Sequence, residues 1–184
     1  MIGNWVFGMI ERIWDSEKGK YRAGRKVFIV VDKRNIATLR PIITKYVRPE
    51  SLLYSDGWGA YRKAGTWKRV ASDGNKVPFF QKHKWVNHNK HFVDPTDGTH
   101  TNTIEGAWGR SKACVPAKHY CDEVALQQHL FKQMWDAKWK DNLWAGMIEA
   151  LQMVRFDERS KILVISYCDD VTGKRKMLGW RWKE

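Results

Sequence analysis

A strand pattern, a helix pattern and a second strand pattern follow one another within residues 26–55. Residues 26–31 are almost continuously apolar, which is typical of a strand buried on both faces of a mixed sheet. Over residues 36–47, apolar side chains recur at intervals of three and four, which predicts a helix that packs on the strands. The second strand, residues 51–55, stops at Asp56. This order predicts an α/β fold, and such sheets tend to build their sites at the carboxyl ends of strands, where Asp56 lies.

The segment before this unit predicts a β-hairpin. Residues 4–14 read as a strand, and turn residues at 15–19 connect it to the strand at 26–31. The connecting flank, residues 19–26, is rich in lysine and arginine. Within the predicted helix, Pro41 lacks an amide donor, so we expect that helix to begin near Leu39.

Weaker patterns predict the rest of the chain. We expect a short helix at 58–64, short strands at 66–70 and around 85–86, and a loop at 72–82. Helices are predicted at 122–140 and 142–154, with Asp122 and Asn142 as their N-caps. A C-terminal hairpin is predicted from 161–167 and 177–182. The apolar side chains expected to face inward on the first of these helices form two rows, Leu126, Leu130 and Met134, and Phe131, Trp135 and Trp139. Those expected to face inward on the second helix are Leu143, Trp144, Met147, Ile148 and Leu151.

The segment 100–112 predicts a helix with an acidic and a basic group on one polar face. Asn102, Glu105 and Lys112 are three and seven residues apart, so they project from nearly the same side. Glu105 and Lys112 would lie about 10 Å apart along the axis, a spacing that suits a metal-bound phosphate and a cation on the next stretch of nucleic-acid backbone. The alternative is a capping pair, in which Asn102 caps the helix and Glu105 reaches back to its amide. The spacing by itself favours the cap.

The charge of the chain favours a polyanionic partner. Its 33 Lys and Arg residues against 20 Asp and Glu residues give a net charge of +13. This balance points first to nucleic acid and second to an anionic membrane surface. No apolar run approaches the roughly 20 residues that cross a bilayer, so we expect a soluble, intracellular protein without a membrane partner. The basic side chains that read as a phosphate track, rather than a solvated face, are Lys82, Lys84, Lys90, Arg110 and Lys112.

A zinc site is a weaker alternative. The three cysteines form no CxxC pair, so we expect reduced thiols. Four histidines and three further Cys and His residues are close in sequence, but their spacing fits no familiar zinc pattern. We expect His100 to hydrogen-bond a phosphate or the helix start instead. Of the eleven tryptophans, Trp108 is expected to pack in the core, whereas Trp58 suits either packing or nucleic-acid contact. The possible zinc ligands are His83, His88, His91, His100, Cys114, His119 and Cys121.

Four segments resemble a known family: WVFGMIER, VDKRNIATLRPII, YSDGWGAY and VNHNKHFVDPTDGTHTNTIEGAWGRSK. They are similar to the ISXO2-like transposase domain of the IS1595 insertion-sequence family, in the DDE superfamily, and to its eukaryotic relatives. The resemblance extends roughly from Trp5 to Leu151. It implies a ribonuclease-H-like α/β fold, with a mixed sheet flanked by helices. We therefore expect a core at 1–156 that lacks its first strand, and a C-terminal β-hairpin extension at 157–184.

The resemblance also implies a chemistry. In that family three carboxylates hold two divalent metals, usually Mg²⁺ and alternatively Mn²⁺, for cleavage and joining of DNA. Mg²⁺ prefers such hard oxygen ligands, and metal ions activate the attacking oxygen of a phosphodiester displacement. By position, Asp56 corresponds to the second carboxylate, Glu105 to the third, and Lys112 to a basic residue that orients DNA. For Asp56 the alternative is a turn residue before Gly57. The further side chains expected to contact DNA are Trp58, Lys84, Lys90, His100, Asn102 and Arg110.

The sequence departs from the family at the first carboxylate. In the family this residue lies on a strand before WVFG, which this sequence does not contain. Asp15 falls in the hairpin turn and Asp32 precedes the helix, so neither is expected to replace it. We expect this polypeptide by itself to lack strand-transfer activity.

Two alternatives to a complete transposase follow. One is a catalytically inactive DNA-binding relic or host-recruited domain, and the other is an enzyme completed by a polypeptide that donates the strand. The expected partner is DNA at transposon ends, bound by a homodimer because transposition joins two ends. Resemblance to eukaryotic members predicts the nucleus; a bacterial source would predict the cytoplasm or nucleoid.

Overall fold

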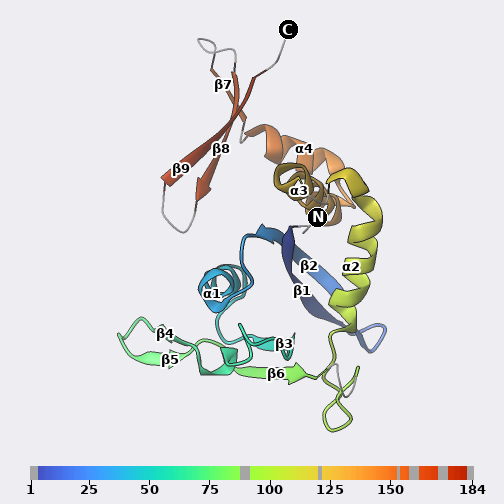
Figure 1. Ribbon diagram of the computed structural model, residues 1–184, viewed down its shortest axis with the longest axis vertical. Coiled ribbons are helices and arrows are strands. Elements are labelled where there is room, and N and C mark those ends of the chain that lie inside the picture. The colour runs from blue at the N-terminus through green and yellow to red at the C-terminus, as the bar shows by residue number, and fades with distance from the viewer. Residues whose placement is uncertain are drawn as a thin grey trace. The chain divides into compact units, whose positions relative to one another are not determined.

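The computed structural model describes residues 4–87, 92–119, 122–152, 154–157, 162–169 and 174–181, with side chains in the first three of these ranges. The chain divides into two compact units, Met1–Met134 and Trp135–Glu184. Figure 1 shows the elements in order along the chain. The expected boundary after residue 156 stays a prediction.

The first unit begins with the predicted hairpin. Strands β1 (Trp5–Asp15) and β2 (Lys20–Val31) pair antiparallel from Trp5↔Val31 to Asp15↔Lys20, with a register irregularity between Ile10 and Arg12. The second strand starts six residues earlier than expected. The first half of β2 has no apolar pattern that would predict a strand. It is a strand because it pairs with β1 through cross-strand hydrogen bonds.

Helix α1 (Ile36–Tyr46) follows the hairpin and begins earlier than predicted. Asn35 caps it: its side chain accepts the Thr38 amide at 3.0 Å, and its carbonyl accepts the Leu39 amide at 3.0 Å. The expectation that Pro41 delays the start was therefore wrong. Pro41 lies inside the helix, where it removes a single backbone hydrogen bond, whereas the Asn35 cap fixes the start of the helix at Ile36.

Strands β3 (Leu52–Asp56) and β6 (Lys82–Val86) pair in parallel, from Leu52↔Lys82 to Asp56↔Val86. Between them lie a 3₁₀ turn, η1 (Ala64–Thr66), and the short hairpin of β4 (Lys68–Val70) and β5 (Lys76–Pro78). The predicted helix at 58–64 was wrong, because the turn that starts at Trp58 tightens into 3₁₀ bonding at Ala64. The predicted loop at 72–82 contains β5.

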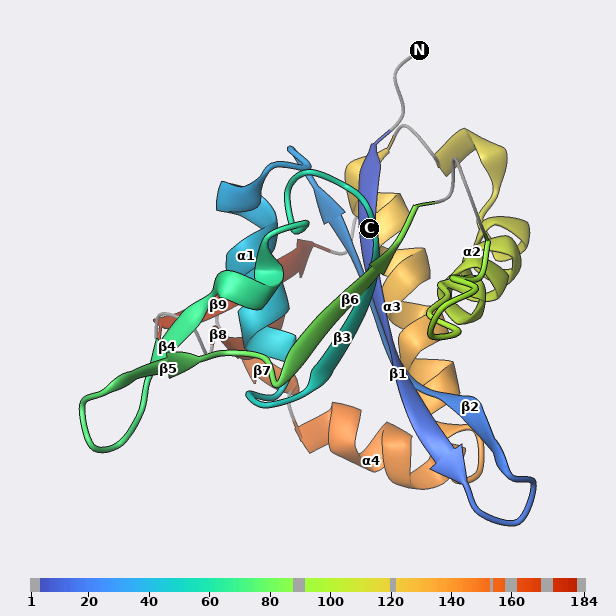
Figure 2. The ribbon, with the colours of Figure 1, turned by 90° about the horizontal axis from the view of Figure 1, so that it is seen from below.

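The helices of the first unit cover both faces of the β1–β2 hairpin. Alternation along β1 sends Phe7 and Met9 toward a cluster centred on α1, and Val6 and Ile10 toward a cluster on α2 (Asn102–Cys114) and α3 (Glu123–Trp139). Figure 2 shows α1 on one side of the hairpin and α2 on the other. Asp122 caps α3 by accepting the Ala125 amide at 2.9 Å, as predicted. The first expected apolar row on α3 is confirmed, since Leu126, Leu130 and Met134 belong to the second cluster. The expectation that Phe131 faces inward was wrong, because its side chain is 55% exposed.

The described strands of this unit form separate two-stranded sheets where one mixed sheet was expected. β1 pairs only with β2, and β3 only with β6, among the strands that the structure describes. Nevertheless Phe7 and Met9 of β1 and Leu53 of β3 pack against the same α1 cluster. The two sheets therefore share a helix but not a hydrogen-bond ladder.

The second unit holds the C-terminal sheet. Helix α4 (Leu143–Gln152) is capped by Asn142, whose side chain accepts the Ala145 amide at 3.0 Å. Strands β7 (Val154–Asp157), β8 (Ile162–Asp169) and β9 (Lys174–Arg181) form an antiparallel sheet in that order. The predicted hairpin is present as β8 and β9. Val154, predicted as the helix end, begins β7 instead.

The apolar row of α4 does not face inward as predicted. Gly146 is the buried residue of this helix, and a methyl group there would lie 2.5 Å from the Trp139 ring. Helix α4 therefore contacts Trp139 through the backbone at Gly146, and not through a row of leucines. The apolar side chains left exposed are Leu143, Trp144, Met147, Ile148 and Leu151.

Candidate functional site

Asp56 ends β3, and its carboxylate is held by the residues that follow. Oδ1 accepts the Trp58 amide at 3.1 Å and the Tyr61 hydroxyl at 2.5 Å. Burial raises the pKa of Tyr61, and the hydrogen bond to the Asp56 carboxylate and its charge raise it further. The phenol therefore remains a proton donor at physiological pH. Both bonds use the same carboxylate oxygen, so they fix the orientation of Asp56 and leave Oδ2 for another ligand.

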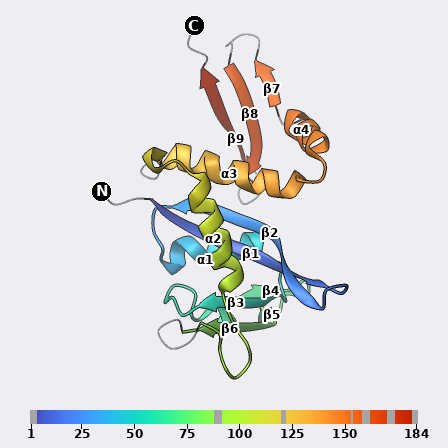
Figure 3. The ribbon, with the colours of Figure 1, turned by 90° about the vertical axis from the view of Figure 1, so that its right-hand side faces the viewer.

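Strand alternation determines the face on which Asp56 lies. Leu53 packs against the α1 cluster, so Tyr54 and Asp56 start from the opposite face of β3. Ser55 lies on the face of Leu53, and its hydroxyl is 2.8 Å from His83 Nε2. Helix α2 packs over the face of β1 away from α1. Asp56 on β3 and α2 on β1 thus both lie on the side of their strand away from the α1 cluster, and Figure 3 shows α2 running across β1 and β2.

Glu105 lies exposed in the first turn of α2. Its Oε1 accepts the Thr101 hydroxyl at 2.7 Å. Thr101 is the N-cap and Asn102 is the first helical residue, so the predicted capping pair between Asn102 and Glu105 was wrong by one residue. The i to i+4 separation of Thr101 and Glu105 brings hydroxyl and carboxylate together, which orients the acid at the helix start.

A glycine and a tryptophan set the position of α2. Trp108 packs against Phe28 with ring centroids 4.5 Å apart, as expected of a core residue. A methyl group on Gly8 of β1 would lie 2.4 Å from the Trp108 ring. Only a glycine at this position lets the helix approach the strand so closely. Glu105, one turn earlier on α2, is placed by this contact.

His100, which was expected to hydrogen-bond a phosphate or the helix start, feels the charges of Glu105 and of Arg12, a residue that sequence reasoning left out. Burial lowers the pKa of His100, the positive charge of Arg12 lowers it further, and the Glu105 carboxylate opposes both. Arg12 Nε and His100 Nδ1 are buried atoms without a hydrogen-bond partner among the described residues. The Arg12 guanidinium also lies over the ring of Tyr54, 5.8 Å from its centroid. Arg12 therefore links the surroundings of Glu105 with the strand that carries Asp56.

Lys84 already has a partner in the folded chain. Its ammonium lies 2.9 Å from Asp97 Oδ2, and that hydrogen bond raises the pKa of Lys84. The Thr99 hydroxyl, the Lys84 ammonium and the Thr99 amide lower the pKa of Asp97 to about 2. This pair ties the segment that precedes α2 to β6. The role of Lys84 in DNA contact stays a prediction.

Three further predicted DNA contacts lie on α2, and one lies outside the described residues. Asn102, Arg110 and Lys112 are exposed, and Asn102, Glu105 and Lys112 share the polar face that their spacing predicted. Lys90 lies outside the described residues.

Trp58 forms a stack with two residues that sequence reasoning missed. The Arg34 guanidinium carbon is 4.2 Å from the Trp58 ring centroid and 3.9 Å from that of Trp5. Trp58 Nε1 also donates to the Arg34 carbonyl at 3.1 Å. Both rings stay partly exposed. The basic pair before α1, in VDKRN, was the one sequence signal for Arg34.

The zinc alternative gains no support. Within the part of the chain that the structure describes, no three His, Cys, Asp or Glu side chains are grouped to hold a metal. His119 Nδ1 and His129 Nε2 lie 2.8 Å apart, but they are a pair. Cys114 is a free thiol, as expected. His88, His91 and Cys121 lie outside the described residues, as does the side chain of Cys168.

Comparison with known proteins decides the lineage. The family model described as the ISXO2-like transposase domain matches residues 4–135. The chain belongs to the ISXO2-like transposase family. The match contains both Asp56 and Glu105 and ends at the first residue of the second unit. No curated protein and no solved structure matches the chain. None of the described helices is long and apolar enough to cross a membrane.

Proposed function

We propose that the first unit is the DNA-processing core of a transposase, in which Asp56 and Glu105 hold a divalent metal for cleavage and joining of DNA. The observation that carries this proposal is the orientation of Asp56. Tyr61 and Trp58 hold it at the carboxyl end of β3. In this proposal Glu105 reaches the same metal from the first turn of α2, which packs on the face of β1 opposite α1. A family whose members are transposases makes DNA the expected substrate.

The two carboxylates suit the metal. Mg²⁺ and Mn²⁺ take hard oxygen ligands and keep positions for water and phosphate. When bound, such an ion would stabilise the charge that develops on the phosphate. The contribution of the chain is to position its ligands: Tyr61 orients Asp56, Thr101 orients Glu105, and Lys112 offers a cation two turns along α2.

A third carboxylate is absent from the group among the described residues. We propose that it comes on an extended strand between β1 and β3, from this protein or from another polypeptide. Both strands have a ladder on one side only among those described, and both pack on α1. A strand between them would join the two sheets into one ribonuclease-H-like sheet. It would also bring an acceptor toward the buried Arg12 Nε and His100 Nδ1.

DNA would lie along the exposed basic face of α2. Arg110 and Lys112 would contact the backbone, and Asn102 and His100 the phosphate nearest Glu105. Trp58 would add an aromatic contact beside Asp56. Joining two transposon ends needs two such sites, so the active form is a homodimer on DNA. Lys84 and Lys90 would extend the basic surface.

A second function, DNA binding without catalysis, is favoured by one observation. The described residues bring no third acid to Asp56 and Glu105, and two carboxylates hold a divalent ion weakly. This chain would then bind DNA without cleaving it.

Nicking of supercoiled DNA separates the two functions. Mg²⁺-dependent nicking by the full chain should fall more than about 100-fold in Asp56→Asn and Glu105→Gln, since even outer-shell partners of metal sites are worth about 10- to 100-fold. Asp73→Asn, which changes an exposed carboxylate in the β4–β5 turn, is the matched control. Nicking that survives both site substitutions would overturn the assignment. Salt-sensitive binding without nicking would establish the second function.

A further inference from the structure

Aromatic and cationic side chains alternate along one face of the β1–β2 hairpin and continue onto β3. The Trp14 and Tyr21 rings meet edge to face with centroids 5.0 Å apart. The Arg12 guanidinium lies over both Tyr21, at 4.8 Å, and Tyr54, at 5.8 Å. The Lys84 ammonium is 5.7 Å from the Tyr54 centroid. We call these five residues the aromatic track.

The register of the strands explains why these residues share a face. Trp14 pairs with Tyr21, and Arg12, two residues before Trp14, pairs with Ala23. Residues two apart on a strand point to the same side, so Arg12 and the two rings lie together. Tyr54 and Asp56 share a face of β3 for the same reason. The aromatic track therefore runs from the outer part of the hairpin to the strand that ends in Asp56.

The outer rings of the aromatic track are not part of a core. Trp14 is 55% and Tyr21 54% exposed, and both lie near the turn of the hairpin. Neither belongs to the two clusters that hold the first unit together. Large aromatic surfaces left in water gain free energy when a flat ligand covers them.

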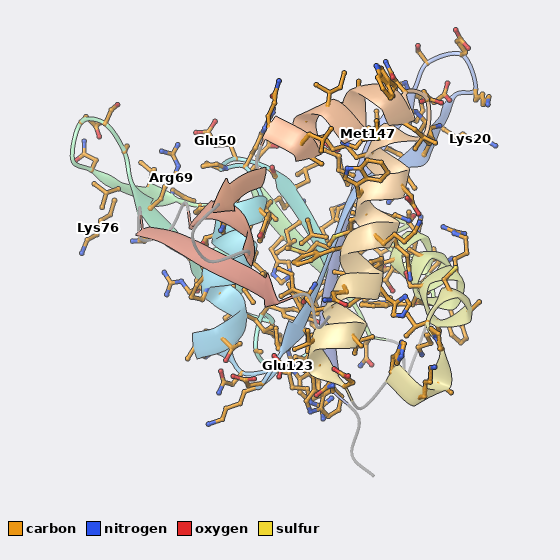
Figure 4. All side chains as sticks on the ribbon, turned by 90° about the horizontal axis from the view of Figure 1, so that it is seen from above. Lys20, Glu50, Arg69, Lys76, Glu123 and Met147 are labelled. Carbon is orange, nitrogen blue, oxygen red and sulfur yellow. The ribbon has the colours of Figure 1, made fainter. Side chains whose placement is uncertain are left out.

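The charge around these rings selects the ligand. Lysines and arginines are frequent along the same hairpin, and Figure 4 shows Lys20 at its tip. Because Arg25 is paired with Glu11 at 3.0 Å, the other lysines and arginines of the hairpin give its surface a positive charge. Arg12 adds positive charge between the rings, whereas the Lys84 ammonium beyond them is paired with Asp97. A ligand with flat rings joined by negative groups fits this surface.

We propose that the aromatic track binds an unpaired strand of DNA. Bases stack on Trp14 and Tyr21, and the phosphates between them face Arg12. In a duplex the faces of the bases are covered by their neighbours, whereas an unpaired strand offers them to aromatic side chains. The edge-to-face angle of 70° between the rings suits one base on each ring. This inference rests on the proposed function, because it names the form of DNA that the proposed site binds. A DNA strand bound to the aromatic track would extend along β1 toward Asp56.

Binding without metal tests the aromatic track independently of catalysis. Fluorescence anisotropy of the full chain in EDTA would compare labelled oligothymidylate of about 16 nucleotides, the upper range of such site sizes, with duplex DNA of equal length. The wild type should bind the single strand more tightly than the duplex. Trp14→Ala and Tyr21→Ala should each weaken single-strand binding about tenfold and change duplex binding less than single-strand binding. Trp14→Phe, which keeps a stacking face, should restore most of the affinity.

Trp144→Ala is the matched control, because this α4 tryptophan is 67% exposed and is not one of the five residues of the aromatic track. Circular dichroism would check the fold of each variant, and the Trp14→Phe comparison decides the outcome if an alanine variant unfolds. Equal losses on single strand and duplex, or no loss in either ring variant, would overturn the inference. Tighter binding of duplex by the wild type would do the same. Asp56→Asn should abolish nicking and keep single-strand binding. Failure of the proposed function would therefore appear in the nicking assay, and failure of the aromatic track in the binding assay.

Discussion

The Tyr61 hydroxyl donates a hydrogen bond of 2.5 Å to Asp56 Oδ1, five residues earlier in the chain. The ring of Tyr61 packs against the α1 cluster and lies 6.2 Å from that of Phe7 on β1. The donor is thus anchored in the core, and the acceptor lies at the end of β3. This hydrogen bond therefore fixes the carboxylate proposed to hold the metal relative to the core.

Tyr61→Phe should therefore weaken metal use more than folding. Losing an outer-shell hydrogen bond is expected to cost about 10- to 100-fold in metal affinity or activity, and about 1 kcal/mol in stability. Nicking measured against Mg²⁺ concentration, with a urea unfolding curve for each protein, checks both numbers. Tyr46→Phe changes an exposed tyrosine of α1 and is the control. An unchanged Mg²⁺ dependence in Tyr61→Phe would reduce Tyr61 to a packing residue.

Gly8→Ala should separate α2 from β1. Its methyl group would lie 2.4 Å from the Trp108 ring and 2.8 Å from that of Phe28, so the helix must shift. Overpacking of this kind costs about 1–3 kcal/mol. Gly109→Ala, on the same helix and with nothing within 4 Å of its methyl group, should stabilise by about 0.5–1 kcal/mol. Equal unfolding midpoints for the two variants would contradict this account of the packing.

Asp97 should make stability depend on pH at the acid end. Its pKa of about 2 in the folded chain lies below the ordinary value of 3.8. The ionised form is therefore favoured by folding: its contribution is complete above pH 3.8 and is lost as the pH falls through 2. Asp97→Asn should be less stable than the wild type at neutral pH, and the difference should vanish near pH 2.

Urea unfolding as a function of pH measures this effect. Asp141→Asn, at a carboxylate that is 86% exposed, is the control and should show little difference at any pH. A gap between Asp97→Asn and wild type that does not change with pH would show that Asp97 acts through something other than its charge.

Arg34→Ala should weaken DNA binding more than removal of a neighbouring charge. The substitution removes a cation and also releases the rings of Trp5 and Trp58 that the guanidinium holds. Each such cation–π contact is worth about 0.5–1 kcal/mol at an exposed site. Lys33→Ala removes the same charge from the adjacent exposed position. Filter binding over a range of salt concentrations should show a larger loss for Arg34→Ala; equal losses would leave only a charge effect.

Local pattern was enough to predict several elements. The apolar periodicity of α1 and α3, the strand ending at Asp56, and the caps at Asp122 and Asn142 depend on residues within a few positions of one another. The polar face of α2 was also predicted, because a helix fixes the direction of Asn102, Glu105 and Lys112 by their spacing. The neighbours of Glu105 were not predicted, since Arg12 is far away in the sequence.

The sequence by itself determined the lineage, the positive charge and the two acidic candidates, because motifs, composition and short-range periodicity are properties of the chain as written. Only the tertiary structure decided that Tyr61 holds Asp56 and that Gly8 admits Trp108. It also showed that Arg12 lies over Tyr54 and that β1 and β3 share α1 without sharing a ladder. The physical reason is range. Hydrogen bonds and ring contacts act over a few ångströms, and only folding brings residues distant in the chain within that reach.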